Sequence, residues 1–144
     1  MKTSFISTAM ISLIATSTLA AGTPGAGFLE NWDGDANGAV TVAEVAEKRE
    51  NIFYTFDENG DGIITGDEYV AFDEARAADQ ANENQGNGNA GHGRASAGMT
   101  LEFNDTDGNG EVTMEEFIGN SEAWFALLDR NTDGVVTTAD FGRQ

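Results

Sequence analysis

The 144-residue sequence predicts an all-α protein in which two duplicated loop–helix–loop units pack as a compact helical bundle. Three observations support this fold class. A short acidic loop of one pattern occurs four times. Within each pair of loops the connection is only 12 residues long and has apolar residues at helical spacing. Residues 33–69 also align with residues 105–141 at a constant offset of 72 (105 minus 33), which indicates a duplicated unit.

The loops cover residues 33–44, 57–68, 105–116 and 129–140 and are called loops 1 to 4 in that order. Each has Asp or Asn at positions 1, 3 and 5, Gly at position 6, an aliphatic residue at position 8 and an acid at position 12. Alternate residues of a tightly turned loop can direct oxygen atoms at one centre, and Ca²⁺ takes about six to eight oxygen ligands. The pattern therefore predicts up to four bound Ca²⁺ ions.

The expected ligands are the side chains at positions 1, 3, 5 and 12, the backbone carbonyl at position 7, and the Thr at position 9 acting through a water molecule. Loop by loop, the candidate metal ligands are Asp33, Asp35, Asn37, Ala39, Thr41 and Glu44; Asp57, Asn59, Asp61, Ile63, Thr65 and Glu68; Asp105, Asp107, Asn109, Glu111, Thr113 and Glu116; Asp129, Asn131, Asp133, Val135, Thr137 and Asp140. Asp140 is one methylene shorter than Glu, so we expect loop 4 to be the weakest Ca²⁺ site and to accept Mg²⁺.

Composition excludes several classes of function. The formal net charge of −18 argues against nucleic acid and anionic membranes as partners, and it predicts that metal binding and folding are coupled. The sequence has no Cys, and therefore no disulfide, thiolate metal site or cysteine nucleophile. No nucleophile constellation or phosphate-binding loop occurs, and nearly all acids are accounted for as ligands or solvated residues. We therefore do not expect an enzyme.

Residues 1–20 have the features of a secretory signal peptide, with Lys2, a short apolar stretch, and small residues before a cleavage site near Ala20. The alternative is a membrane anchor, but the stretch is shorter and more polar than the roughly 20 apolar residues that span a bilayer. We expect a periplasmic or secreted protein with no stable membrane insertion after cleavage.

Residues 21–81 hold the first pair of loops. A small-residue leader precedes Phe28, Leu29 and Trp32, which approach loop 1, and we expect Trp32 to contact the core and to report on metal binding. The helix between loops 1 and 2 has one apolar face, made by Val45, Ile52, Phe53 and Phe56. On its other side we expect Lys48 and Arg49 to be solvated.

Residues 82–98 are rich in Gly and Asn and predict a flexible linker, in which the single His, His92, is expected to be solvated. A decayed fifth loop over residues 81–92 is an open alternative, without metal binding. Residues 99–144 hold the second pair, where Asn104 takes the usual apolar place before the first ligand of loop 3. Both pairs are expected to form one domain.

The short connections decide which loops can pair. A helix of about 12 residues is about 18 Å long, so loops that are adjacent in sequence lie at opposite ends of it. If the two linking helices pack antiparallel, loop 1 pairs with loop 4 and loop 2 with loop 3. The position-8 residues then meet, Val40 with Val136 and Ile64 with Val112.

This loop pattern resembles the EF-hand calcium-binding family, and the short spacing together with the signal peptide resembles lanmodulin-like exported bacterial EF-hand proteins. The resemblance covers residues 33–72 and 101–142. It implies a bundle with paired loops and, as an alternative to Ca²⁺, selective lanthanide binding. The chain departs from the lanmodulin pattern, since it lacks Pro at position 2, has Thr at position 9 and offers three carboxylates per loop. These departures favour Ca²⁺.

Two roles fit a calcium-binding protein of this kind. One is a periplasmic calcium buffer, and the other is a sensor that folds on metal binding and then engages a metal-dependent protein partner. Sensors with a Met-rich groove need clustered Met residues. After signal cleavage only Met99 and Met114 remain, and they are not clustered, which favours the buffer.

Overall fold

The computed structural model describes residues 23–83 and 92–142, so the expected signal peptide and residues 84–91 of the considered fifth loop lie outside the described residues. The described part is mostly helical, in agreement with the predicted all-α class. None of its helices is both long and apolar enough to cross a membrane. The elements are α1 (Ala26–Trp32), α2 (Val42–Phe56), β1 (Ile63–Ile64), α3 (Gly66–Glu83), α4 (His92–Ala97), α5 (Leu101–Asn104), β2 (Val112–Thr113), α6 (Met114–Gly119), α7 (Ser121–Leu128) and α8 (Thr138–Phe141).

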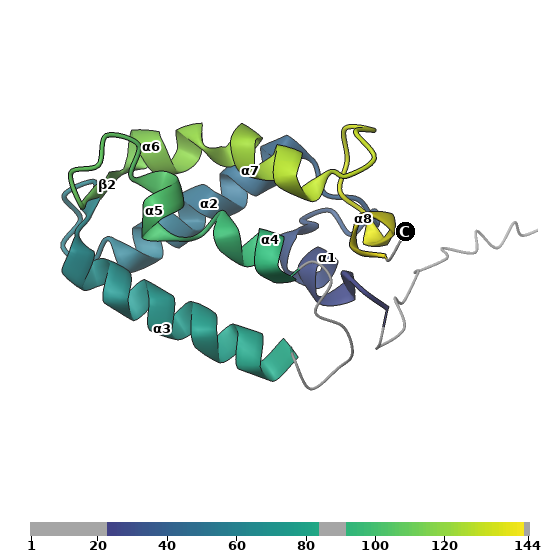
Figure 1. Cartoon of the computed structure of the whole chain (residues 1–144), viewed down its shortest axis with the longest axis horizontal. Helices are drawn as coiled ribbons and strands as arrows, with labels where there is room; N and C mark the ends of the chain where they lie inside the picture. The colour runs from purple at the N-terminus through teal and green to yellow at the C-terminus, as the bar shows by residue number, and fades with distance from the viewer. Residues whose placement is uncertain (1–22, 84–91, 143–144) are drawn as a thin grey trace, which may run out of the picture.

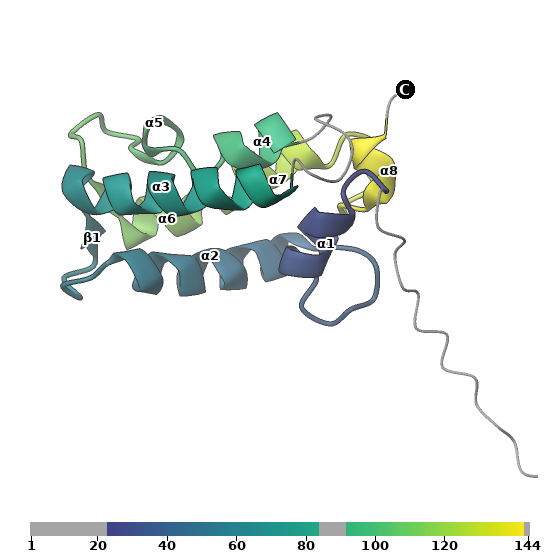
Figure 2. The same cartoon turned by 90° about the horizontal axis from the view of Figure 1, so that it is seen from below.

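Helix α2 runs along the molecule and packs against α6, α7 and α3 (Figures 1 and 2). The strands β1 and β2 lie at one end of α2, and helices α1 and α8 lie at the other end in both views. The two halves of the chain are therefore in contact along their linking helices. The loops that α2 joins lie at its opposite ends.

An aromatic core lies between these helices. On α2, Val45 and Phe53 are completely buried, and Ile52 and Phe56 pack against the core from partly buried positions. This confirms the apolar face expected for the helix. Across from it, the rings of Phe53 and Phe117 lie 5.8 Å apart. Burial of such large side chains is the main favourable term in folding.

Two short backbone contacts close the ends of the bundle. Strand β1 pairs antiparallel with β2, with Ile64 opposite Val112. At the other end an isolated bridge joins Val40 and Val136, whose amides each donate to the other's carbonyl at 2.8 Å. All four side chains are fully buried. These are the position-8 residues of the loops.

The helix between loops 3 and 4 is interrupted, whereas α2 is continuous. Helix α6 ends at Gly119, and α7 begins at Ser121. Gly and Asn have low helix propensity, and the carboxamide of Asn120 donates to the carbonyl of Phe103 at 3.1 Å instead of facing solvent. The aligned residues in α2 are Glu47 and Lys48, which favour an unbroken helix.

The prediction that Arg49 is solvated is wrong, although Lys48 is exposed as expected. Arg49 is fully buried, and its guanidinium lies over the rings of Phe117 and Trp124, 4.0 Å and 5.3 Å from their centroids. Carbonyl oxygens of the second half accept its hydrogen bonds. A sequence pattern does not reveal such acceptors, because they belong to a distant part of the chain.

Both described ends of the segment 82–98, which was expected to be a flexible linker, contain helix. Helix α3 continues to Glu83, and α4 begins at His92. Helix α4 packs on α7, where the indole Nε1 of Trp124 donates to the carbonyl of Arg94 at 3.0 Å. Gly98 lies so close to Trp124 that an added Cβ would be 1.9 Å from the ring. The small residues that resemble a linker here permit close packing.

Candidate metal-binding loops

Each loop is held between the end of one helix and the start of the next. The Asp at position 1 is the C-cap of the entering helix in all four loops, at Asp33, Asp57, Asp105 and Asp129. The Thr at position 9 is the N-cap of the exiting helix in loops 1, 3 and 4, at Thr41, Thr113 and Thr137. In loop 2, Thr65 makes the corresponding bond by accepting from the Glu68 amide. The helix ends therefore fix where each loop begins and ends.

The carboxylate at position 1 organises the loop from inside. Asp33 accepts from the Gly38 amide at 2.7 Å and from the Asn37 amide at 3.2 Å. The Gly at position 6 donates to the first Asp in the other three loops as well, each time at 2.9 Å. In all four loops this Gly has φ between 83° and 90°, in the left-handed region that favours glycine. The loop is thus curled around its first carboxylate.

The Glu at position 12 ties the end of the loop to its start. One oxygen of Glu44 accepts from the Gly34 amide at 3.0 Å, and the other accepts from the amide and hydroxyl of Thr41 at 2.8 Å. Glu68 and Glu116 repeat this arrangement in loops 2 and 3. The Thr at position 9 therefore contacts the acid directly, in addition to any role through water.

These hydrogen bonds keep the acids ionised. Bonds from the Thr113 amide and then the Thr106 hydroxyl lower the pKa of Glu116 to about 2. Bonds from the Thr65 amide and hydroxyl likewise lower the pKa of Glu68. For Glu44, burial raises the pKa, but the bonds from Thr41 and neighbouring amides outweigh it, so the pKa is lowered. Ionised carboxylates are the form that a hard cation binds.

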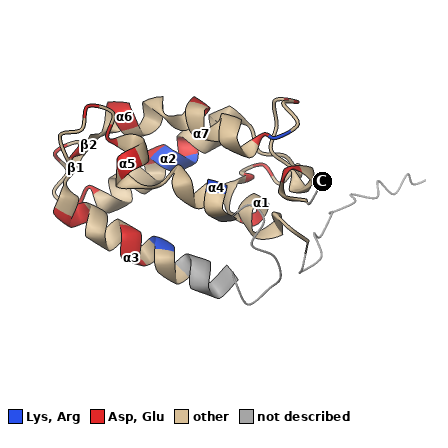
Figure 3. Cartoon of the chain, in the orientation of Figure 1, with Lys and Arg blue, Asp and Glu red and all other residues tan. Residues whose placement is uncertain are grey.

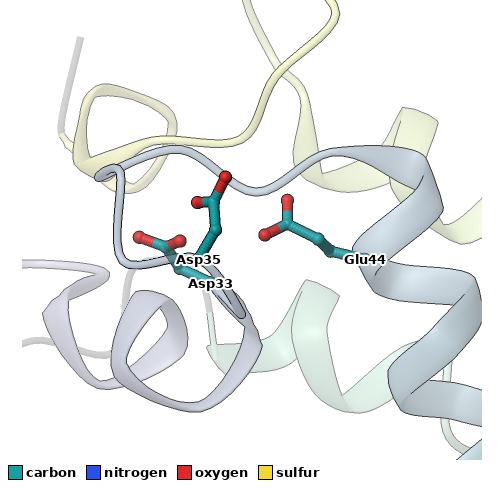
Figure 4. A group of neighbouring side chains, drawn as sticks. All are labelled: Asp33, Asp35 and Glu44. Atoms are coloured by element: carbon teal, nitrogen blue, oxygen red, sulfur yellow. The ribbon is translucent and has the colours of Figure 1, made fainter.

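Carboxylates converge in two of the loops. Among the described residues, groups of three acids with oxygens within 4.8 Å of one another occur in loop 1 (Asp33, Asp35 and Glu44) and loop 3 (Asp105, Asp107 and Glu116). Figure 4 shows Glu44 reaching from the start of α2 toward the carboxylates of Asp33 and Asp35. Such a set of oxygens fits a hard divalent cation.

Loops 2 and 4 differ because their second Asp is at position 5 and Asn is at position 3. The position-5 carboxylates of Asp61 and Asp133 accept from the amides of Ile63 and Val135 at 2.9 Å and 3.1 Å. The amides of Asp61 and Asp133 in turn donate to the side-chain oxygens of Asn59 and Asn131. Loops 2 and 4 therefore have the same backbone hydrogen bonds to the acids at positions 1 and 12 as loops 1 and 3, but their second Asp is at position 5 instead of position 3.

In loop 4 the shorter acid sits deeper. Asp140 is only 2% exposed, and it accepts from the amides of Arg130 at 3.0 Å and Thr137 at 2.8 Å. Its distance to the Thr137 hydroxyl is 3.4 Å, against 2.8 Å for the Glu–Thr pair in loops 1 to 3. The carboxylate thus makes the same contacts, but with a looser bond to the Thr.

The backbone at position 4 separates the loops into two kinds. Loops 2 and 3 have Gly60 and Gly108 there, with φ of 72° and 73°. Loops 1 and 4 adopt the same left-handed conformation with Ala36 and Thr132, both at φ 58°. A residue with a side chain is strained in this region, most of all when it is β-branched. The sequence analysis did not consider position 4, although Gly at two of the four places was a signal.

A buried polar network, not predicted from the sequence, lies beside loops 2 and 3. The Asn104 position before loop 3 was recognised as unusual, and Asn104 is completely buried. Its carboxamide accepts from Arg49 and donates to the hydroxyl of Tyr69 at 3.1 Å. A polar residue in an otherwise apolar place was the signal that could have revealed the network.

Acidic residues dominate the surface around the loops. Figure 3 shows Asp and Glu on the loops at both ends of the molecule and along α3, with few Lys or Arg. Within the described residues the recorded ion pair joins Arg76 and Asp73 on α3, away from the loops. The charge therefore attracts cations to both ends.

Comparison with known proteins agrees with this geometry. Residues 46–75 match the model of an EF-hand domain pair, and residues 100–118 match that of an EF hand. The first matched segment contains the whole of loop 2, and the second contains the whole of loop 3.

The chain is also similar to the calcium-binding protein LPS1-beta of Lytechinus pictus. The two are 25% identical over 158 aligned positions, which cover 81% of this chain and 65% of that protein, less than two thirds of its length. No solved structure matches the chain. The two matched segments are therefore similar to EF hands, and the relative is a calcium-binding protein.

Proposed function

We propose that this protein binds Ca²⁺ through four EF-hand loops and acts as an exported calcium buffer or sensor whose folding is coupled to metal. The observation that carries the proposal is the convergence of three carboxylates within 4.8 Å in loops 1 and 3, inside the hydrogen-bonded frame of an EF hand. Three negative charges at such short separations repel, and a bound divalent cation removes that repulsion.

We include loops 2 and 4 among the metal sites because their hydrogen-bonded backbone is the same as that of loops 1 and 3. They have the same left-handed Gly at position 6 and the same acid clamp at position 12. The backbone contacts Val40–Val136 and Ile64–Val112 support a pairing of loop 1 with loop 4 and of loop 2 with loop 3. We propose one metal ion in each loop.

A selective lanthanide-binding protein is the second candidate. The observation that favours it is the continuous helix α2, which holds loops 1 and 2 at opposite ends as expected for lanmodulin-like proteins. The carboxylate count argues for Ca²⁺, since each loop offers three acids and a trivalent ion gains more than Ca²⁺ from additional charge. A periplasmic or secreted location would supply Ca²⁺ without an energy-dependent store.

Between the two roles, the buffer is the simpler proposal. The described exposed apolar side chains are Val42, Tyr54, Val70 and Leu127, on three different helices. A sensor would bind a partner protein only in the presence of metal. Capture of a partner in Ca²⁺ but not in chelator would therefore favour the sensor role. In either role the protein works by binding ions, without catalysis.

The test is a titration of metal-free protein with buffered Ca²⁺ and, separately, buffered La³⁺, followed by far-ultraviolet circular dichroism. We expect helix to form with both ions in a similar concentration range. Folding by La³⁺ at concentrations many orders of magnitude lower would support the lanthanide alternative. The control is the Glu44→Gln, Glu116→Gln double variant, which removes one carboxylate from each convergent group. If this variant binds Ca²⁺ as well as the unsubstituted protein, the site assignment is wrong.

A further inference from the structure

A buried arginine connects the two halves of the molecule. Arg49, in the middle of α2, is fully buried and donates through Nε and Nη2 to the carbonyl of Phe117 and through Nη1 to the carbonyl of Gly98 at 2.8 Å. Its partners are carbonyl and amide oxygens of the second half. Burial lowers the pKa of Arg49 to about 10, so it stays protonated at neutral pH. A buried charge of this kind depends on keeping all its acceptors in place.

Asn104 is the second member of this network. Its Oδ1 accepts from Nη2 of Arg49, and its Nδ2 donates to the hydroxyl of Tyr69 and to the carbonyls of Gly98 and Thr100. The hydroxyl of Tyr69 donates in turn to the carbonyl of Met99 at 3.0 Å. Arg49 and Tyr69 come from the first half, and all their acceptors come from the second. The network exists only when the halves are docked.

The members of the network are chain neighbours of metal ligands. Tyr69 follows Glu68, the last ligand of loop 2, and Phe117 follows Glu116, the last ligand of loop 3. Asn104 precedes Asp105, the first ligand of loop 3. A movement of one loop that displaces its ligand therefore reaches the other loop through a few hydrogen bonds.

Helix α5 makes loop 3 especially dependent on this connection. It has four residues, and a helix of one turn has no stability of its own. Its last residue, Asn104, is held by Arg49 and Tyr69, and Asn120 donates to the carbonyl of Phe103 beside it. The place of Asp105 is thus set by side chains from α2, α3 and the α6–α7 junction in addition to its C-cap hydrogen bond to the Leu101 carbonyl.

We propose that Arg49 and Asn104 are positioning residues that couple metal binding in loop 2 to metal binding in loop 3. The inference rests on the proposed function, because it concerns the affinity of the same loops for Ca²⁺. Metal in loop 2 fixes Glu68 and with it Tyr69, and the network then holds Asn104 and Asp105 in the arrangement that loop 3 needs. By thermodynamic linkage, metal in loop 3 raises the affinity of loop 2 by the same factor.

Loops 1 and 4 provide an internal control. They also touch through a backbone bridge, between Val40 and Val136. The hydrogen bonds of Arg49 and Asn104, however, end on residues 69 and 98–117 and do not reach either loop. Arg49 also lies over the ring of Trp124, 5.3 Å from its centroid, so the two pairs of loops are compared most cleanly in Tyr69→Phe, which leaves Arg49 in place. A network that only stabilised the fold would change both pairs of loops alike. If the network couples the two sites, its replacement changes the coupling of loops 2 and 3 and leaves that of loops 1 and 4 unchanged.

The experiment measures Ca²⁺ affinity in proteins with selected loops silenced. In a Glu44→Gln, Asp140→Asn background only loops 2 and 3 are active, and adding Glu68→Gln leaves loop 3 alone. The coupling factor is the affinity of loop 3 with loop 2 active divided by its affinity with loop 2 silenced. The corresponding factor for loops 1 and 4 is measured in a Glu68→Gln, Glu116→Gln background.

The network is then replaced by Arg49→Met with Asn104→Leu. The two changes together remove the buried charge and its amide partner. The carbonyls of Phe117 and Gly98 lose their side-chain donors, so we expect a less stable protein, but no buried charge is left unpaired and the protein is expected to fold. We expect a coupling factor for loops 2 and 3 of about 5 or more, which falls below about 2 in this variant. The factor for loops 1 and 4 should stay within about twofold of its original value. Tyr69→Phe, which loses only the hydroxyl, should lower the first factor in the same direction.

Two results would overturn the inference while the proposed function stands. One is a factor for loops 2 and 3 that is close to one or that does not change on substitution. The other is an equal fall in both factors. Absence of Ca²⁺ binding in the unsubstituted protein is a different result, because it overturns the proposed function itself and the inference with it. Should the double substitution prevent folding, Tyr69→Phe decides the question by the same criteria.

Discussion

Trp32 and Trp124 meet edge to face, with ring centroids 4.7 Å apart and planes at 71°. Trp32 immediately precedes Asp33, the first ligand of loop 1, and Trp124 is a fully buried core residue on α7, which leads into loop 4. The pair therefore joins the entrances of the two loops at one end of the molecule.

From this contact we expect intrinsic tryptophan fluorescence to change when metal enters loop 1. Trp32→Phe should remove most of that change, because the remaining Trp124 is fully buried in the core and is not a chain neighbour of a ligand. Tyr54→Phe, at an exposed position of α2, is the control. A signal that persists unchanged in Trp32→Phe, or that persists when Glu44→Gln silences loop 1, would contradict the assignment.

Replacing the strained residue at position 4 of loops 1 and 4 by Gly should stabilise the folded protein. Thr132→Gly and Ala36→Gly should each raise the free energy of unfolding by about 1 kcal/mol, because Gly adopts φ near 58° without a steric cost. Gly60→Ala and Gly108→Ala should lower it by a similar amount, since an added Cβ at either place meets no neighbouring atom and only the backbone is strained. Urea unfolding with and without Ca²⁺ measures both. Equal effects at all four positions would show that φ does not decide the outcome.

Substitution of Gly98 should destabilise the protein by a steric clash and not by backbone strain. Gly98→Ala would place a methyl group 1.9 Å from the Trp124 ring, so the ring or α4 must move, at a cost of about 1–3 kcal/mol. Gly93→Ala is the matched control, because Gly93 lies in α4, which directly precedes Gly98, and nothing is within 4 Å of its added Cβ. The control should be neutral or slightly stabilising. Thermal melting distinguishes the two, and a tolerated Gly98→Ala would mean that α4 does not pack on Trp124.

Loop 4 should be the weakest Ca²⁺ site, and Asp140→Glu should strengthen it. The longer side chain reaches the ion with both oxygens, as the Glu at position 12 of the other loops is expected to do. Calorimetric titration of the unsubstituted protein and the variant gives the four affinities. The prediction does not survive if the weakest affinity is unchanged in Asp140→Glu. Preference of the unsubstituted loop 4 for Mg²⁺ can be read from the same titrations.

The folded protein should lose stability in acid. The pKa of Glu116 is about 2 in the folded protein against 4.5 without its partners, and the pKa values of Glu68 and Glu44 are also lowered. A lowered pKa contributes stability that is fully present above pH 4.5 and is lost as the pH falls toward 2. Urea midpoints measured at several pH values and one fixed Ca²⁺ concentration should decline over this window. Glu116→Gln should make the decline shallower.

Much of the fold could be read from the sequence because it repeats. The repeated spacing of acids and Gly predicted where each loop lies, and the apolar spacing of Val45 and Phe53 predicted the buried face of α2. The residue pairs Val40–Val136 and Ile64–Val112 followed from helix length together with antiparallel packing of the two linking helices, and backbone bridges join these residues.

What the sequence did not reveal depends on contacts between distant residues. Arg49 carries the same charge as the exposed Lys48, and only its place opposite Phe117 and Asn104 makes it a buried residue. Helix α4 was not predicted for a related reason. A Gly such as Gly98 suggests a flexible segment when only the sequence is known, whereas in the structure it allows close contact with Trp124. Local composition does not contain these partners.

One consequence of the continuous helix α2 concerns insertions and deletions. The helix is the exit of loop 1 and the entrance of loop 2, so its length fixes both the separation and the relative rotation of the two ends of the molecule. One inserted residue would shift one end by about 1.5 Å and rotate it by about 100°. Such a change would break the register of Ile64 with Val112 or of Val40 with Val136 unless the α6–α7 segment changed by the same amount. An insertion or deletion in one linking segment is therefore expected to be tolerated only with an equal change in the other.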